Sequence, residues 1–208
     1  YGPNNAGWEF WNKAETTRAF NLFFGNPGAG LPELPGIFTF FNWGDVNFYL
    51  LDNRTYRTSD VVDSSALGWP RKLLGKAQVD WLVDTMKYCQ GQSGPRESYP
   101  STFHVVCIGN QVLSEALDEN YPNYREEFEY LFSRILHEGI ERVVFISGDV
   151  HFGEVNRRVM TGGGESAIGR AGVAGAQYTF VEITSSPLTA GPWPGAPGTE
   201  NPYRVDLF

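Results

Sequence analysis

Short apolar runs recur along the chain, and five of them have the length of β-strands. They cover residues 37–43, 46–51, 102–109, 142–147 and 178–184. The first two are rich in aromatic residues and flank Gly44-Asp45, a pair typical of a tight turn, so they predict a β-hairpin. The other three are continuous rather than alternating, which is typical of strands buried on both faces of a sheet.

Segments with helical spacing of apolar residues separate these runs. Residues 16–24 predict a short helix that ends before Pro27. Residues 75–89 predict a second helix. A third is predicted to begin at Asn123 as its N-cap and to end at Gly139. The alternation of strands and helices predicts an α/β domain with a layered sheet, to which the hairpin adds antiparallel pairing.

Composition narrows the class of protein. The 208 residues include 19% charged and 15% aromatic residues, which is typical of a folded chain and not of a disordered one. The net charge of −8 disfavours nucleic acid and anionic membranes as partners. No run reaches the roughly 20 apolar residues of a membrane helix. With only Cys89 and Cys107, a disulfide scaffold and a cysteine-only zinc site are excluded. Gly- and Pro-rich residues 25–36, 162–175 and 187–202 predict loops.

The strongest candidate chemistry follows the run at 142–147. Gly148 allows a sharp turn, and Asp149 and His151 come next, two positions apart. In extended geometry both side chains point to one face, where a carboxylate and an imidazole can bind one divalent metal ion. The alternative is structural: Asp149 caps the loop and His151 is a hydrogen-bonded residue at the strand end.

Arg54 and Arg57 form a second candidate, because they follow the run at 46–51. A guanidinium can contact two phosphate oxygens at once, which lysine cannot match. The alternative is a structural ion pair between one of these arginines and Asp52. Cys107 with His104 is a weaker candidate, since a spacing of three does not place them on one strand face.

Several segments together resemble the PhoD-like alkaline phosphatases, a family of metallophosphoesterases. SGDVHFGE after RVVFI resembles the family's closing metal motif, and FFNWGDVNFYLLDNRTYR resembles its central segment. LLGKAQVDWL, FHVVCIGNQV and YTFVEITSSPL resemble a helix and two later strands. YGPNNA resembles the stretch that follows the family's Asp-Asp-His-Asp segment. The matches run in order along nearly the whole chain.

The resemblance implies a layered β-sandwich flanked by helices, and hydrolysis of phosphate esters as a phosphomonoesterase or phosphodiesterase. It implies a two-metal site holding calcium with iron, or other divalent ions, with metal-bound hydroxide attacking phosphorus. Asp149 and His151 carry over as metal ligands, and Asn5 as a further one, although Asn4-Asn5 after Gly-Pro is also ordinary turn chemistry. The resemblance implies a secreted or endomembrane compartment, which the residues themselves leave open.

The chain also departs from the family pattern. The family's first Gly-Asp motif, Asp-Tyr ligands, iron-binding Cys and Asp-Asp-His segment would all precede Tyr1. We therefore expect residues 1–208 to be the carboxyl-terminal part of the family domain, inactive alone, with one sheet face uncovered. A missing amino-terminal segment or another chain would then complete the site. A non-catalytic binding or assembly module with the same fold, and a domain that binds one calcium ion, are the competing hypotheses.

Overall fold

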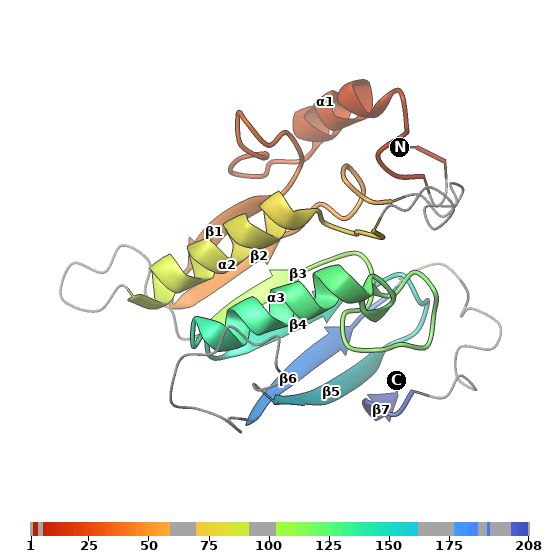
Figure 1. Cartoon of the computed structure of the whole chain (residues 1–208). Coiled ribbons are helices and arrows are strands. Elements are labelled where there is room, and N and C mark those ends of the chain that lie inside the picture. Colours follow the sequence, from red (N-terminus) through yellow and green to blue (C-terminus); the bar gives the residue numbers. More distant parts are fainter. Residues whose placement is uncertain are drawn as a thin grey trace.

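The computed structural model describes residues 2–3, 6–58, 70–91, 103–161, 177–186, 191 and 201–207. Within them, helices pack on a seven-stranded sheet with the order β1-β2-β3-β4-β6-β5-β7 (Figure 1). The predicted α/β class is confirmed. The described residues form one sheet, which corresponds to a single layer of the expected sandwich.

The predicted hairpin is confirmed. β1 (Thr39–Trp43) pairs antiparallel with β2 (Val46–Leu50), and Trp43 lies opposite Val46. The turn between them is tight because Gly44 adopts a φ of 62°, a conformation that costs a residue without Cβ little.

Four parallel strands form the centre of the sheet. β2 pairs with β3 (Phe103–Cys107), which pairs with β4 (Val143–Ser147), which in turn pairs with β6 (Gln177–Thr184). Parallel strands bring all their carboxyl ends to one edge of the sheet, and side chains from the loops at that edge can therefore meet.

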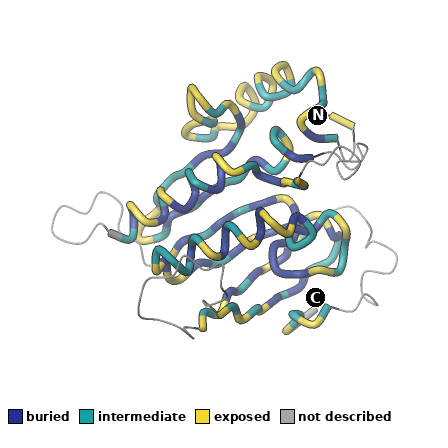
Figure 2. Tube along the Cα trace, in the orientation of Figure 1, coloured by how far each residue is buried: buried dark blue, intermediate teal, exposed yellow. Residues whose placement is uncertain are grey.

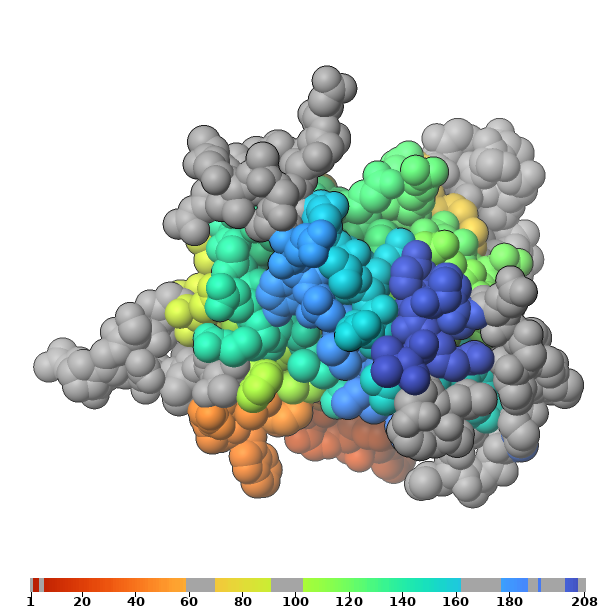
Figure 3. Space-filling model, turned by 90° about the horizontal axis from the view of Figure 1, so that it is seen from below, coloured from red at the N-terminus to blue at the C-terminus, as the bar shows by residue number. Residues whose placement is uncertain are grey.

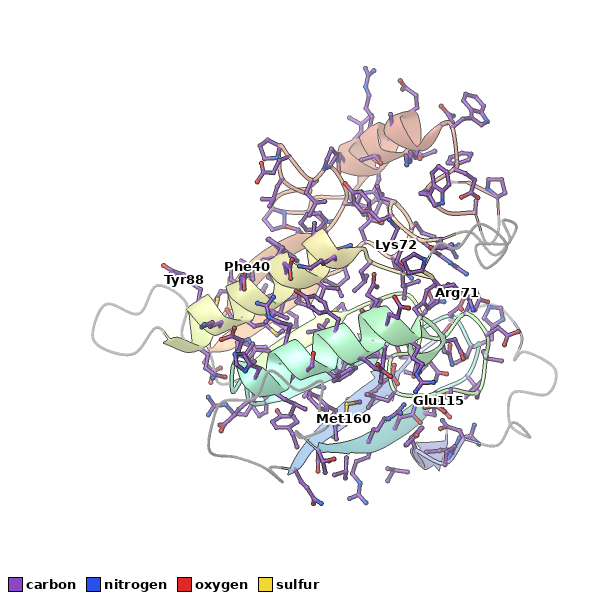
Figure 4. All side chains as sticks on the ribbon, viewed as in Figure 1. Phe40, Arg71, Lys72, Tyr88, Glu115 and Met160 are labelled. Carbon is purple, nitrogen blue, oxygen red and sulfur yellow. The ribbon has the colours of Figure 1, made fainter. Side chains whose placement is uncertain are left out.

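Two antiparallel strands that the sequence pattern did not predict complete the sheet. β5 (Glu154–Thr161) pairs with β6, and β7 (Arg204–Leu207) pairs with β5. Figure 3 shows β7 at the surface beside β5. Glu115, labelled in Figure 4, comes from the loop after β3 and forms an ion pair with Arg158 of β5 (2.8 Å).

Helices α2 (Lys76–Gly91) and α3 (Arg125–His137) lie side by side on one face of the sheet (Figure 1). The core lies between these helices and the sheet. Figure 2 shows buried residues along the strands and on both helices. Phe132 of α3 packs on Phe180 of β6, with ring centroids 4.8 Å apart. Arg134 of α3 also donates hydrogen bonds to Asp80 (2.9 Å) and Asp84 (2.8 Å) of α2, which ties the two helices together.

The opposite face of the sheet is apolar and partly exposed. Its side chains alternate with those that face the helices, as a strand requires. Ile146 of β4 lies beside Ile183 of β6, and the two residues are 38% and 44% exposed. Phe103, Trp43 and Val159 continue this exposed surface onto three further strands.

Helix termini follow the prediction only in part. Gly139 ends α3 with a φ of 63°, as expected, but Asn123 is not its N-cap. Asn123 instead belongs to a 3-10 turn, η1 (Tyr121–Asn123), and its amide donates to the Leu117 carbonyl (2.7 Å). α1 (Lys13–Phe23) contributes no buried residue. Among the described residues, no helix has the length and apolar character needed to cross a membrane.

Candidate active site

The segment after β4 has an unusual backbone. Asp149 and His151 have φ angles of 78° and 62°, a region that residues with a side chain rarely adopt. The expected extended geometry is therefore wrong: the chain turns at both residues instead of continuing as a strand. Asp149 is exposed and His151 is partly exposed, so neither side chain is part of the core. Such strained backbone is characteristic of functional sites.

Two asparagines from neighbouring strand ends orient Asp149. The Nδ2 of Asn110, which follows β3, donates to Oδ2 of Asp149 (3.0 Å). Because a carboxylate only accepts, this bond fixes the Asn110 amide, and its Oδ1 accepts in turn from Nδ2 of Asn53, after β2. The ends of three parallel strands are thus linked in one chain of hydrogen bonds. Sequence reasoning missed both asparagines, although Gly109-Asn110 directly after a buried strand is a readable signal.

Gly109 makes this contact possible. A Cβ on Gly109 would lie 2.8 Å from Nδ2 of Asn53, closer than side-chain carbons approach in proteins. A larger residue would therefore push Asn53 away from Asn110, and the chain of hydrogen bonds to Asp149 would break.

His151 is oriented by a backbone carbonyl. Its Nδ1 lies 3.2 Å from the carbonyl oxygen of Gly191. A carbonyl can only accept, so Nδ1 carries the proton and Nε2 carries the free lone pair of the neutral ring. Metal-binding histidines are held in this way, with one ring nitrogen donating to a carbonyl and the other facing the ion.

The donors at this edge fit part of a metal shell. A carboxylate oxygen of Asp149 and the Nε2 of His151 suit divalent ions such as zinc, manganese or iron. In the part of the chain that the structure describes, no three His, Cys, Asp or Glu side chains gather to hold an ion. Asn5, the further expected ligand, lies outside the described residues.

Arg54 is presented to solvent by a tight turn after β2. The carboxylate of buried Asp52 accepts hydrogen bonds from the backbone N–H groups of Ile37 (3.0 Å), Arg54 (3.0 Å) and Thr55 (2.9 Å). It also accepts from the Thr55 hydroxyl (2.6 Å). Asp52 therefore shapes the turn through its backbone, and Arg54 is exposed just past the carboxyl end of β2.

Arg57 occupies a different environment. Its side chain is fully buried, and Nη2 forms an ion pair with Oε2 of Glu119 at 3.3 Å. The backbone carbonyl of Arg57 also accepts from Trp8 N (2.9 Å). A guanidinium buried in this way cannot reach a substrate in solvent, so the expected phosphate contact does not fit Arg57.

Buried carboxylates hold the loop that carries Asn110. Glu182 of β6 accepts from the backbone N–H groups of Val112 (2.6 Å) and Leu113 (3.0 Å). Gln111 donates to Glu154 of β5 (2.6 Å), so the loop is attached to two strands. Burial raises the pKa of Glu182, while the N–H groups that it accepts from favour its charged form.

The weaker thiol candidate is not activated. Burial raises the pKa of the Cys107 thiol, which disfavours the reactive thiolate. His104 is buried, points to the face covered by the helices, and lies 2.8 Å from the Tyr49 hydroxyl through Nδ1. Burial and the nearby Arg142 lower the pKa of His104 to about 4, so the ring is neutral at pH 7.

Comparisons with known proteins identify the family and the fold of the chain. A search of the curated proteins found no match. Among solved structures, one entitled "Structure of PhoD" matches with a TM-score of 0.67 and 16% sequence identity, which shows a shared fold. The match covers 98% of this chain and 42% of that one, so the chain spans less than half of the solved protein's length. The sequence profile of the PhoD-like phosphatases matches residues 26–205, and the chain therefore belongs to the PhoD-like phosphatase family.

Proposed function

We propose that the chain contributes one part of a metal-dependent active site that hydrolyses phosphate esters. The observation that carries this proposal is the meeting of three strand ends at Asp149, whose carboxylate is oriented by Asn110 and Asn53. Oriented, solvent-accessible donors at the carboxyl edge of a parallel sheet are the arrangement that metal-dependent hydrolases use.

In this proposal Asp149 and His151 bind divalent metal ions, and Arg54 contacts phosphoryl oxygens. When bound, the metal ions supply the Lewis acidity that transfer of a phosphoryl group to water needs. The Asn110 amide holds the Asp149 carboxylate in one orientation, and the Gly191 carbonyl accepts from Nδ1 of His151, which leaves the Nε2 lone pair for an ion. Arg54 offers the planar guanidinium that pairs with two phosphate oxygens at once. Arg57, paired with Glu119, has a structural role.

We further propose that residues 1–208 form the carboxyl-terminal part of the family domain, and that another segment or chain completes the metal shell. Two protein ligands leave most positions around each ion to water, so an ion bound by this chain alone is held weakly and placed loosely. Support comes from the comparison, in which the chain covers 42% of the solved PhoD structure. We therefore expect no appreciable phosphatase activity from this chain alone.

Calorimetric titration of the purified 208-residue chain with Mn²⁺, Zn²⁺ and Ca²⁺ tests the ligand assignment. We expect weak binding that Asp149→Asn and His151→Gln each abolish. Asp45→Asn is the matched control, because Asp45 also follows a glycine but lies in the exposed hairpin turn. Binding that survives both site substitutions would show that the ligands lie elsewhere.

Hydrolysis of 4-nitrophenyl phosphate and bis(4-nitrophenyl) phosphate tests the reaction. The chain should be inactive with each metal, and chelator-sensitive turnover should appear when it is co-expressed with the rest of a family domain. Turnover by the chain alone would refute the incomplete site. Tight metal binding without turnover in the completed domain would instead favour the non-catalytic module.

A further inference from the structure

A cavity of about 810 Å³ opens between α1, the segment that precedes it and the turn after β2. This volume lies within the range of pockets for small organic ligands, roughly 300–1,000 Å³. Its walls are mainly aromatic and aliphatic, with contributions from Phe10, Phe20, Phe24 and Ile37. The rings of Phe20 and Phe24 stack at 4.4 Å between centroids with an interplanar angle of 13°, so they form one continuous apolar wall.

Two cationic side chains, Arg54 and Lys13, also line this cavity. Lys13 is held at the wall by a hydrogen bond from Nζ to the Trp8 carbonyl (2.7 Å). Among the described residues of the lining, Asp52 is the one acidic residue, and it is committed to the turn, where its two carboxylate oxygens accept hydrogen bonds from backbone and hydroxyl groups. The cavity therefore combines apolar walls with an excess of positive charge, which suits an anion that carries an apolar group.

The cavity shares one residue, Arg54, with the candidate site. Arg54 follows Asn53, so their Cα atoms are about 3.8 Å apart across one peptide bond. Asn53 donates to Asn110, which donates to Asp149. Arg54 thus links the cavity to the carboxyl end of β2, at the same sheet edge as the carboxyl end of β4 that precedes Asp149, so a phosphoryl group that contacts Arg54 can place its organic substituent in the cavity.

We propose that this cavity binds the organic group of the substrate, and that the substrates are phosphate esters of apolar, aromatic-sized alcohols. This inference rests on the proposed function, because Arg54 is the group that joins the two sites. α1 contributes no buried residue to the core, so its aromatic side chains are available to form a binding wall without a role in holding the sheet. Exposed aromatic walls beside charged groups are typical of ligand sites.

Binding of 1-naphthyl phosphate and inorganic phosphate to the purified chain, measured by calorimetry without divalent metals, tests the proposal. Burial of the naphthyl ring should make 1-naphthyl phosphate bind about tenfold more tightly than phosphate, or better. Phe20→Ser should remove this advantage and leave phosphate binding within about twofold. Thr17→Trp, which fills the cavity without removing a wall, should have the same effect. Arg54→Gln should weaken both ligands.

Leu22→Ser is the matched control, since Leu22 lies on the same helix, is 79% exposed and does not line the cavity. It should change neither affinity. Equal binding of the two ligands, or an advantage that survives both Phe20→Ser and Thr17→Trp, would overturn the proposal. Binding of 1-naphthol as tight as that of its phosphate would also overturn it, because the cavity would then ignore the anion. Since no metal is present, these outcomes are independent of the Asp149 titration and of turnover.

Discussion

Positive φ angles at Asp149 and His151 carry an energetic cost of about 1–3 kcal/mol each. Backbone with such angles persists only where surrounding contacts compensate this energetic cost. Here the Asn110 amide holds one side chain and the Gly191 carbonyl holds the other. Both contacts are made within the chain itself, so they compensate the backbone strain at Asp149 and His151 without a ligand.

The buried His104 should make stability depend on pH. Its pKa falls from 6.5 to about 4 on folding, so the unfolded chain binds more protons between these values. Acidification from pH 6.5 to 4 should therefore lower the free energy of unfolding, by about 3 kcal/mol from this residue. Urea denaturation of wild type and His104→Gln, which keeps an acceptor for Tyr49, measures the difference.

Above pH 7, where His104 is neutral in both states, the two proteins should show the same dependence on pH. If the free energy of unfolding of His104→Gln falls between pH 6.5 and 4 as much as that of wild type, the ring is already accessible to protons in the folded chain.

Residue patterns predicted part of the site. Asp149 and His151 were readable because two metal-type ligands follow a glycine at a strand end. Asn53 and Asn110 were missed although each comes just after a predicted strand, because an asparagine at such a place is also ordinary turn chemistry. The positive φ angles were equally hidden, since neither residue is a glycine.

At the scale of elements, Glu127 of α3 binds the backbone that directly precedes the N-terminus of α2. Its carboxylate accepts from the backbone N–H groups of Leu73 (3.1 Å), Leu74 (2.8 Å) and Gly75 (2.8 Å). In Glu127→Ala these three N–H groups would stay buried but lose the carboxylate that accepts their hydrogen bonds. We therefore expect the free energy of unfolding to fall by about 3–5 kcal/mol. Urea denaturation measures this loss.

Glu129→Ala provides the comparison on the same helix. Glu129 is 62% exposed in its side chain and pairs with Arg125 at 2.9 Å, so its removal should change stability by less than about 0.5 kcal/mol. Similar losses of unfolding free energy in the two variants would show that the buried contacts of Glu127 stabilise the fold no more than an exposed ion pair does.

Elements with apolar patterns were predicted, and those with polar buried faces were not. β2, β3, β4 and β6 appear as apolar runs because both of their faces are covered or partly covered. β5 was missed because its buried positions include the polar residues Glu154 and Asn156. The Glu154 carboxylate accepts hydrogen bonds from Asn156 and from Gln111. Only the fold supplies these partners, so the sequence pattern predicted no strand there.

At the scale of the molecule, the sheet has helices on one face and an exposed apolar surface on the other. Large exposed apolar patches favour association. We therefore expect the purified chain to associate with increasing concentration, as measured by sedimentation. A double substitution of the neighbouring pair, Ile146→Thr with Ile183→Thr, should shift it toward the monomer while keeping residues that favour strands.

Leu22→Thr on α1 is the control for this experiment, because it removes an exposed apolar side chain elsewhere. It should leave association unchanged. A chain that stays monomeric at all concentrations, or a response to Leu22→Thr equal to that of the double variant, would argue against the sheet face as the contact.

The strand order has a consequence for the speed of folding. The β1–β2 hairpin joins residues close in sequence and can form within microseconds. The pairings β2–β3, β3–β4 and β4–β6 each join strands separated by a long connection, so the entropy of loop closure must be overcome several times before the centre of the sheet exists. We expect the hairpin to form first, while the pairings of the central strands take milliseconds to seconds. During this time β2 of a nascent chain would expose the edge that later pairs with β3.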